Sequence, residues 1–135
     1  MIYFISGHRD LSYEDFKKYY IPKIKEVVEE DPRAEFIVGD CDGVDKYAMD
    51  YIFNNIMCDL TIYHMSSKPN NTPNNRHPGS LVSSYKYVYF RGGFKSDEER
   101  DAAMTRDSNF DIAFIKDNRW DSGTAQNIQR RYNLK

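Results

Sequence analysis

The 135-residue sequence has no apolar run that approaches the roughly 20 residues needed to span a bilayer. Its apolar start, Met1 to Ile5, has no basic segment before it and ends at once in a polar turn, which predicts a strand and not a signal peptide. The sequence also lacks a basic excess, because 19 Lys and Arg face 21 Asp and Glu. A net charge of −2 argues against nucleic-acid polymers as partners, but it leaves room for a small anionic ligand held by one or two arginines.

Cysteine and histidine are scarce. The two cysteines, Cys41 and Cys58, show neither metal nor redox spacing, so free thiols in a cytoplasmic protein are expected. The three histidines have no ligand spacing, and the acidic stretch 40–45 lacks the pattern of a Ca²⁺ loop. We therefore predict no metal site, no cofactor and no membrane partner.

With 40% apolar and 30% charged residues, the chain reads as one globular α/β domain over 1–135. Short apolar runs at 1–5, 36–38, 60–63 and 111–115 predict buried strands. Helical spacing follows Ser12, where Pro22 predicts a kink or break, and recurs over 44–56, after the Ser96–Glu99 capping box and over 123–132. Residues 66–80 predict a long polar loop, and 85–90 a strand or edge segment. This alternation indicates a parallel sheet with helices on both faces.

Three polar turns fall at the carboxyl ends of the predicted strands, where parallel sheets bind ligands: Ser6-Gly7-His8-Arg9, Gly39-Asp40-Cys41-Asp42-Gly43 and Asp121-Ser122-Gly123-Thr124. Turns at strand ends are rich in Gly and Asp without any ligand too. In the third turn, Ser122, Gly123 and Thr124 favour phosphate binding through free N–H groups and the helix dipole. A plain helix N-cap is the alternative.

The other candidate residues each have two interpretations. Arg100 is a phosphate or carboxylate clamp, or it pairs with Asp97 or Asp101 on its own helix. Asp42 and Asp45 bind ribose hydroxyls or act as general acid or base, although the helix dipole alone favours an acid at Asp45.

The small residues and the first turn are equally open. Gly7 would allow close approach of a ligand, Arg9 would add positive charge, and His8 would bind a ribose or cap the turn. The remaining glycines are a pair that brackets a tight turn and a pair that forms a ligand floor or only a turn: Gly39 and Gly43, and Gly92 and Gly93.

Taken in order, three short motifs carry a resemblance to a known family. They are the Gly39–Asp45 turn, Arg100-Asp101-x-x-Met104, and Ser122-Gly123-Thr124-x-x-Asn127. Over nearly the whole chain they resemble the SLOG superfamily of Rossmann-like nucleotide-binding domains, in particular its YspA/YpsA-related group. The resemblance implies a three-layer Rossmann-like fold with a mostly parallel sheet, and a nucleotide-derived ligand such as an ADP-ribose derivative. It also leaves a homodimer open.

The sequence departs from that family at three points. Arg100 is followed by Asp101 where relatives tend to have Asn, and the turn after the second strand is more acidic. Asn127 stands where phosphoribohydrolases of the superfamily place a catalytic Glu, so their mechanism does not carry over at this residue. Three functions remain open: a nucleotide sensor or sequestering module, an N-glycosidase-type hydrolase that uses Asp42, Asp45 or Asp101, and a scaffold with a relict pocket.

Overall fold

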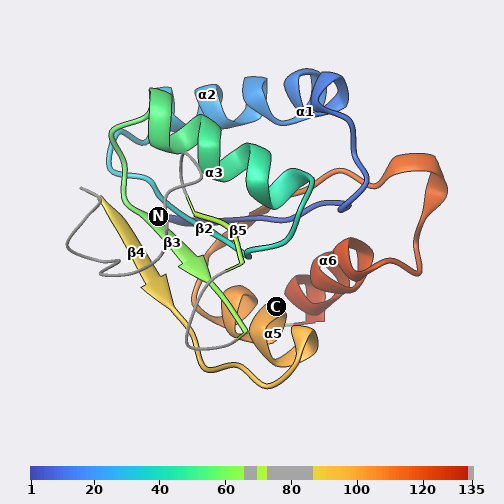
Figure 1. Ribbon diagram of the computed structural model, residues 1–135. Coiled ribbons are helices and arrows are strands. Elements are labelled where there is room, and N and C mark those ends of the chain that lie inside the picture. The colour runs from blue at the N-terminus through green and yellow to red at the C-terminus, as the bar shows by residue number, and fades with distance from the viewer. Residues whose placement is uncertain (66–69, 73–86, 134–135) are drawn as a thin grey trace.

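The structure is a computed structural model that describes residues 1–65, 70–72 and 87–133 (Figure 1). Most of the predicted polar loop at 66–80, and residues 85–86 of the segment after it, lie outside the described residues. The strands are β1 (Ile2–Ile5), β2 (Glu35–Val38), β3 (Leu60–Tyr63), β4 (Val88–Arg91) and β5 (Phe110–Ile112). The helices are α1 (Tyr13–Tyr19), α2 (Ile21–Glu30), α3 (Val44–Asn55), α5 (Asp97–Arg106) and α6 (Gly123–Asn133).

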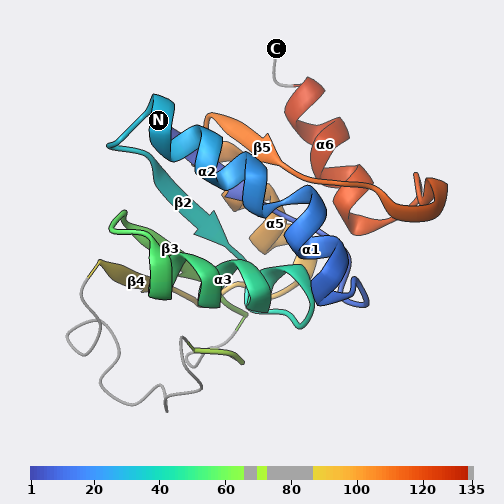
Figure 2. The same ribbon diagram turned by 90° about the horizontal axis from the view of Figure 1, so that it is seen from above.

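The described strands form one parallel sheet in the order β4-β3-β2-β1-β5. In the register of the sheet, Tyr3 of β1 lies opposite Phe36 on one side and Phe110 on the other. Helices cover both faces, with α1, α2 and α3 on one and α5 and α6 on the other (Figures 1 and 2). This is the Rossmann-like three-layer α/β fold that the sequence predicted.

Each face of the sheet has its own apolar core, because the parallel strands are covered by helices on both sides. The larger core packs Phe16, Ile24 and Ile52 from α1, α2 and α3 against the sheet. The smaller core lies under α5, where Ala103 and Met104 pack on Phe4. Within the described part of the chain, no helix has the length and apolarity to cross a membrane.

Two predicted helix starts are confirmed by their caps. The hydroxyl of Ser12 accepts the N–H of Asp15, and that of Ser96 accepts the N–H of Glu99. The expected break in the first helical segment falls at Tyr20. Pro22 then lies in the first turn of α2, where its missing N–H leaves no hydrogen bond unmade.

The strand predicted over 111–115 is wrong in its bounds, because β5 ends at Ile112. Beyond that point, backbone N–H groups donate hydrogen bonds to side chains. The Tyr20 hydroxyl accepts the N–H of Phe114 at 3.0 Å, and Nε2 of His8 accepts the N–H of Lys116 at 3.0 Å. These amides therefore bind the junction between α1 and α2 and the β1–α1 turn instead of continuing the sheet.

The order of the strands creates a switch point between β1 and β5. The chain leaves β1 towards α1 on one face of the sheet, and it leaves β5 towards α6 on the other (Figure 1). Connections that diverge in this way open a crevice at the carboxyl ends of the two strands. The fold therefore predicts the ligand site at this edge.

Candidate functional site

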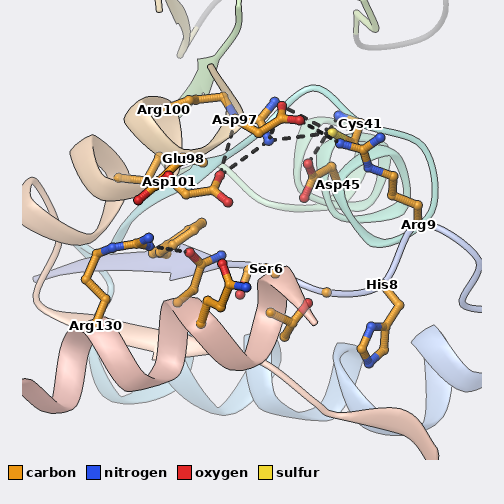
Figure 3. Close-up of a pocket in the computed structure, with 17 residues that line it drawn as sticks. Ser6, His8, Arg9, Cys41, Asp45, Asp97, Glu98, Arg100, Asp101 and Arg130 are labelled. Atoms are coloured by element: carbon orange, nitrogen blue, oxygen red, sulfur yellow. Dashed lines mark hydrogen bonds and ion pairs between the residues drawn. The ribbon is translucent and has the colours of Figure 1, made fainter. Parts of the chain in front are cut away.

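A pocket of about 430 Å³ lies in this crevice (Figure 3). Its walls come from the end of β1 and the turn after it, the start of α3, one face of α5 and the first turns of α6. Nine of the residues that the sequence singled out line it: Ser6, Gly7, His8, Arg9, Asp45, Arg100, Asp101, Gly123 and Thr124.

The other predicted site residues lie outside this pocket. The hydroxyl of Ser122 accepts the N–H of Ala125 at 3.1 Å, so this residue acts as the helix cap that was the alternative interpretation. Asp42 is exposed and lines a neighbouring pocket. Gly92 and Gly93 belong to the connection between β4 and α5 and line none of the pockets described here.

The two remaining glycines build the turn after β2. A Cβ on Gly39 would lie 2.6 Å from Oδ2 of Asp45 and 3.3 Å from the guanidinium carbon of Arg100. Gly43 has a φ of 75°, and a Cβ there would lie 2.4 Å from the backbone oxygen of Arg9. Both glycines are therefore needed for packing and backbone shape, and neither exposes its backbone to the pocket.

One wall of the pocket offers unused hydrogen-bond donors. The Ser6 side chain is 5% exposed, and its hydroxyl has no hydrogen-bond partner. Gly123 and Thr124, which begin α6, line the same pocket, and a Cβ on Gly123 would meet nothing within 4 Å. A buried hydroxyl without a partner is costly, and a helix N-terminus attracts anions, so this wall is suited to an acceptor group such as a phosphate.

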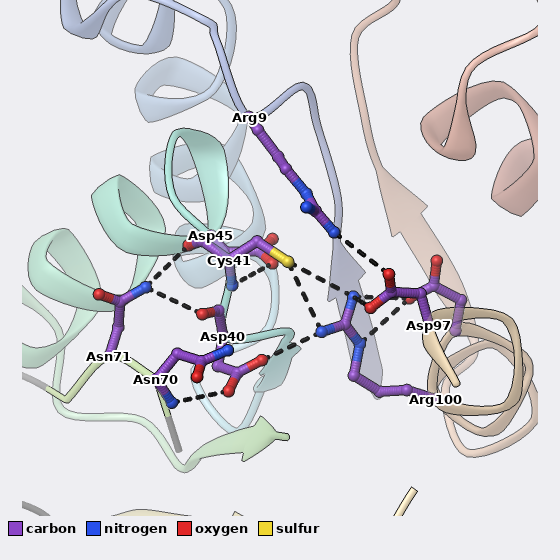
Figure 4. A network of polar contacts seen from close by, with 9 residues as sticks. Arg9, Asp40, Cys41, Asp45, Asn70, Asn71, Asp97 and Arg100 are labelled. Carbon is purple, nitrogen blue, oxygen red and sulfur yellow. Dashed lines mark hydrogen bonds and ion pairs between the residues drawn. The ribbon is translucent and has the colours of Figure 1, made fainter. Parts of the chain in front are cut away.

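Arg100 is buried and its guanidinium is already occupied (Figure 4). It donates to Asp40 at 3.0 Å and to Asp101 at 3.3 Å, and it contacts Sγ of Cys41 at 3.6 Å. It also lies 3.5 Å from Asp97. Burial alone would lower the pKa of Arg100, but the neighbouring Cys41, Asp101 and Asp45 raise it, so the guanidinium stays charged. Arg100 therefore ties α5 to the turn after β2 and has few donors left for a ligand.

Asp45 is the buried acid of the pocket. Its Oδ2 accepts the N–H of Cys41 at 3.1 Å. Desolvation by burial raises its pKa to about 7, against the lowering effects of that hydrogen bond and of Arg100. A carboxyl with a pKa near neutrality can hold or release a proton, which is what general acid–base catalysis requires.

Asp101 belongs to a second polar group that links α5 and α6. Burial raises the pKa of Asp101, while Arg100 and a hydrogen bond from Asn127 oppose that shift. The side-chain oxygen of Asn127 accepts from Arg130 at 2.6 Å. Asn127 thus joins the acid to a second arginine, which lines the pocket from α6 (Figure 3).

His8 faces the β5–α6 connection through the bond from Lys116 described above. Burial lowers the pKa of His8, and the positive charges of Arg119 and Lys116 lower it further. Tyr20 has a similar role, since its hydroxyl donates to the backbone oxygen of Ser6 at 2.9 Å. Both side chains hold the turn after β1 to the chain that leads into α6.

Eight residues that line the pocket were not assigned to the site from the sequence. Two are apolar, Phe4 and Met104, and six are polar: Cys41, Asp97, Glu98, Gln126, Asn127 and Arg130. Helical spacing was the signal that could have found the residues on α5 and α6. Positions 97, 100, 101 and 104 share one face of α5, and 123, 126, 127 and 130 share one face of α6.

Comparison with family models, with curated proteins and with solved structures finds no match to this chain. Among the described residues, no group of three or more His, Cys, Asp or Glu side chains is placed to hold a metal ion. The pocket is therefore the feature of the molecule from which its function is inferred.

Proposed function

We propose that this protein binds a nucleotide or nucleotide derivative, such as an ADP-ribose derivative, in the pocket at the ends of β1 and β5, as a sensor or sequestering module. The observation that carries this proposal is the buried, unpartnered hydroxyl of Ser6 in the same pocket as the N-terminus of α6. A phosphate would accept from both, and Arg130 adds a cation to the same pocket. The carboxylates of Asp45 and Asp101 are acceptors for hydroxyl or amino groups of the rest of the ligand.

A thermal-shift screen of the purified protein against nucleoside phosphates, ADP-ribose and cyclic nucleotides tests the proposal. A ligand at a hundredfold excess over its Kd stabilises the fold by about 2.7 kcal/mol, which is about 8 to 14 °C in Tm for a domain of this size. The shift should decrease in Thr124→Val, which removes the hydroxyl at the start of α6.

Thr105→Val is the matched control, because Thr105 is buried on α5 and does not line the pocket. Absence of a shift across the whole panel would refute the proposal and favour the scaffold with a relict pocket.

A second candidate, an N-glycosidase-type hydrolase, is favoured by the pKa of Asp45 near neutrality inside the pocket. In such a reaction the acid would protonate the leaving base or activate the attacking water. Incubation with nucleoside monophosphates, followed by chromatography for free base, tests this candidate. Base release that is lost in Asp45→Asn but kept in Glu29→Gln, a change of an exposed acid on α2 outside the pocket, would establish turnover and assign it to the pocket.

A further inference from the structure

A second pocket, of about 360 Å³, lies beside the first at the carboxyl ends of the strands. The two pockets share four lining residues: Arg9, Cys41, Asp97 and Arg100. Those that line only the second are Asp40, Asp42, Met65, Asn70 and Asn71. The shared residues make the two pockets parts of one groove.

The four shared residues lie where the two pockets meet, and they form a rigid floor and a weakly held ion pair over it (Figure 4). The floor is Arg100 with Cys41, both held by the buried network described above. Above it, Arg9 and Asp97 pair at 3.4 Å with side chains that are 64% and 56% exposed. An exposed pair of this kind contributes little to stability, so a ligand that crosses the groove can displace it.

The second pocket has a defined rim. Both carboxylate oxygens of Asp40 accept hydrogen bonds, Oδ1 from the Arg100 guanidinium and Oδ2 from the backbone N–H of Asn70. The amide of Asn71 donates to the backbone oxygens of Asp40 and Cys41 at 2.9 and 3.1 Å. These bonds fix the segment 70–71 against the turn after β2.

Asp42 remains available to a ligand. It is exposed, and it makes no hydrogen bond or ion pair with another described residue. Because the carboxylates of Asp40, Asp42 and Asp97 outnumber the two arginines, this pocket disfavours a second phosphate. A carboxylate that accepts from neighbouring hydroxyls suits a neutral, hydroxyl-rich group instead.

We propose that the groove binds one ligand in two parts, with an anionic group at Ser6 and the N-terminus of α6 and a hydroxyl-rich group, such as a sugar, at Asp42 and the 70–71 segment. This inference rests on the proposed function, since the first part of the ligand is the phosphate argued above. It adds a second subsite on the far side of the Arg9–Asp97 pair.

Calorimetric titration with two probes, ADP-ribose and inorganic phosphate, tests the second subsite. Asp42→Ala should weaken ADP-ribose binding about tenfold and leave phosphate binding unchanged. Glu29→Ala is the matched control, because it removes the same charge from an exposed site on α2, outside both pockets. Equal ADP-ribose affinity in Asp42→Ala and the parent protein would overturn the inference.

Cys41 gives an independent readout because it lies on the shared floor and is part-exposed, whereas Cys58 is buried near Pro32. In a Cys58→Ala background, saturating ADP-ribose should slow maleimide labelling of Cys41 at least about fivefold, and phosphate should not. Labelling that ADP-ribose leaves unchanged would also overturn the two-part ligand. If neither these probes nor any compound of the thermal-shift panel binds, the proposed function itself fails; if ADP-ribose does not bind, or binds without either effect, this inference alone fails.

Discussion

Ser6→Ala tests whether Ser6 serves to bind a ligand or to support the fold, because the two roles predict opposite effects of the substitution on stability. Ser6 is 5% exposed and its hydroxyl is unpartnered, while its backbone N–H and oxygen are bound to Ile112 and Tyr20. The substitution leaves both backbone bonds in place and removes a buried polar atom whose desolvation costs about 1 to 3 kcal/mol.

We therefore expect Ser6→Ala to raise the free energy of unfolding of the ligand-free protein by about 1 kcal/mol. For a domain of this size that corresponds to an increase of about 3 to 5 °C in Tm. The same change should weaken binding of a phosphate ligand by about 1.5 to 3 kcal/mol, the usual contribution of a hydrogen bond to a charged group. That loss is about 10- to 100-fold in Kd.

Differential scanning calorimetry and isothermal titration measure the two effects, and Thr105→Val provides the comparison. Oγ1 of Thr105 is likewise buried and unpartnered, but it lies outside the pocket. Thr105→Val should therefore stabilise the protein, as Ser6→Ala does, without changing its affinity for the ligand. A Ser6→Ala protein that is less stable than the parent, or that binds phosphate ligands equally well, would refute the reasoning.

Four further substitutions test the surroundings of the pocket. Burial raises the pKa of Asp45 to about 7, so ionisation of this carboxyl destabilises the folded protein, and the effect is complete above that pH. Asp45→Asn should therefore stabilise the protein by up to about 4 kcal/mol at pH 8 and by little at pH 4. Urea unfolding at the two pH values measures the difference. His8 has a lowered pKa, so its contribution is present above its ordinary value near 6.5 and is lost as the pH falls below it. His8→Gln keeps an acceptor for the N–H of Lys116 and should remove that acid-side loss of stability; an unchanged pH profile of the unfolding free energy would contradict this. Gly39→Ala should cost about 1 to 3 kcal/mol because its Cβ meets Asp45, whereas Gly123→Ala, with open space around it, should be near neutral in thermal unfolding.

Periodicity and capping were enough to predict most of the fold. The apolar runs at 36–38 and 60–63 and the caps at Ser12 and Ser96 depend on neighbours in the sequence, and each appears in the structure. The end of β5 depends on Tyr20, whose hydroxyl reaches Phe114 across the fold. A contact between residues so distant in the sequence leaves no local pattern, which is why the strand was predicted too long.

The candidate site, too, could be predicted from the sequence only in part. The positions of the predicted strands indicated that Ser6 and Thr124 would lie at the same edge of the sheet, and both line the pocket there. The state of each side chain could not be predicted in this way. Whether the donors of Arg100 are free depends on the placement of Asp40, which accepts from its guanidinium. The room for that guanidinium depends on Gly39, because a Cβ there would lie 3.3 Å from the guanidinium carbon.

Asn127 lies between two charged residues that line the pocket from α5 and α6. It donates to Asp101 and accepts from Arg130, so it connects an acid on α5 to a cation on α6. A Glu at this position would place a second carboxylate beside Asp101, whose pKa is already raised by burial, and the repulsion would raise it further. With Asn the position carries no titratable proton, and Asp45, on the other side of Arg100, is left as the pocket acid whose pKa lies near 7. The proposed donors to an anion lie at Ser6 and at the start of α6, and the acid that can hold a proton lies on α3. Asp45→Asn should therefore abolish any turnover and leave binding in place, whereas Ser6→Ala should weaken binding itself.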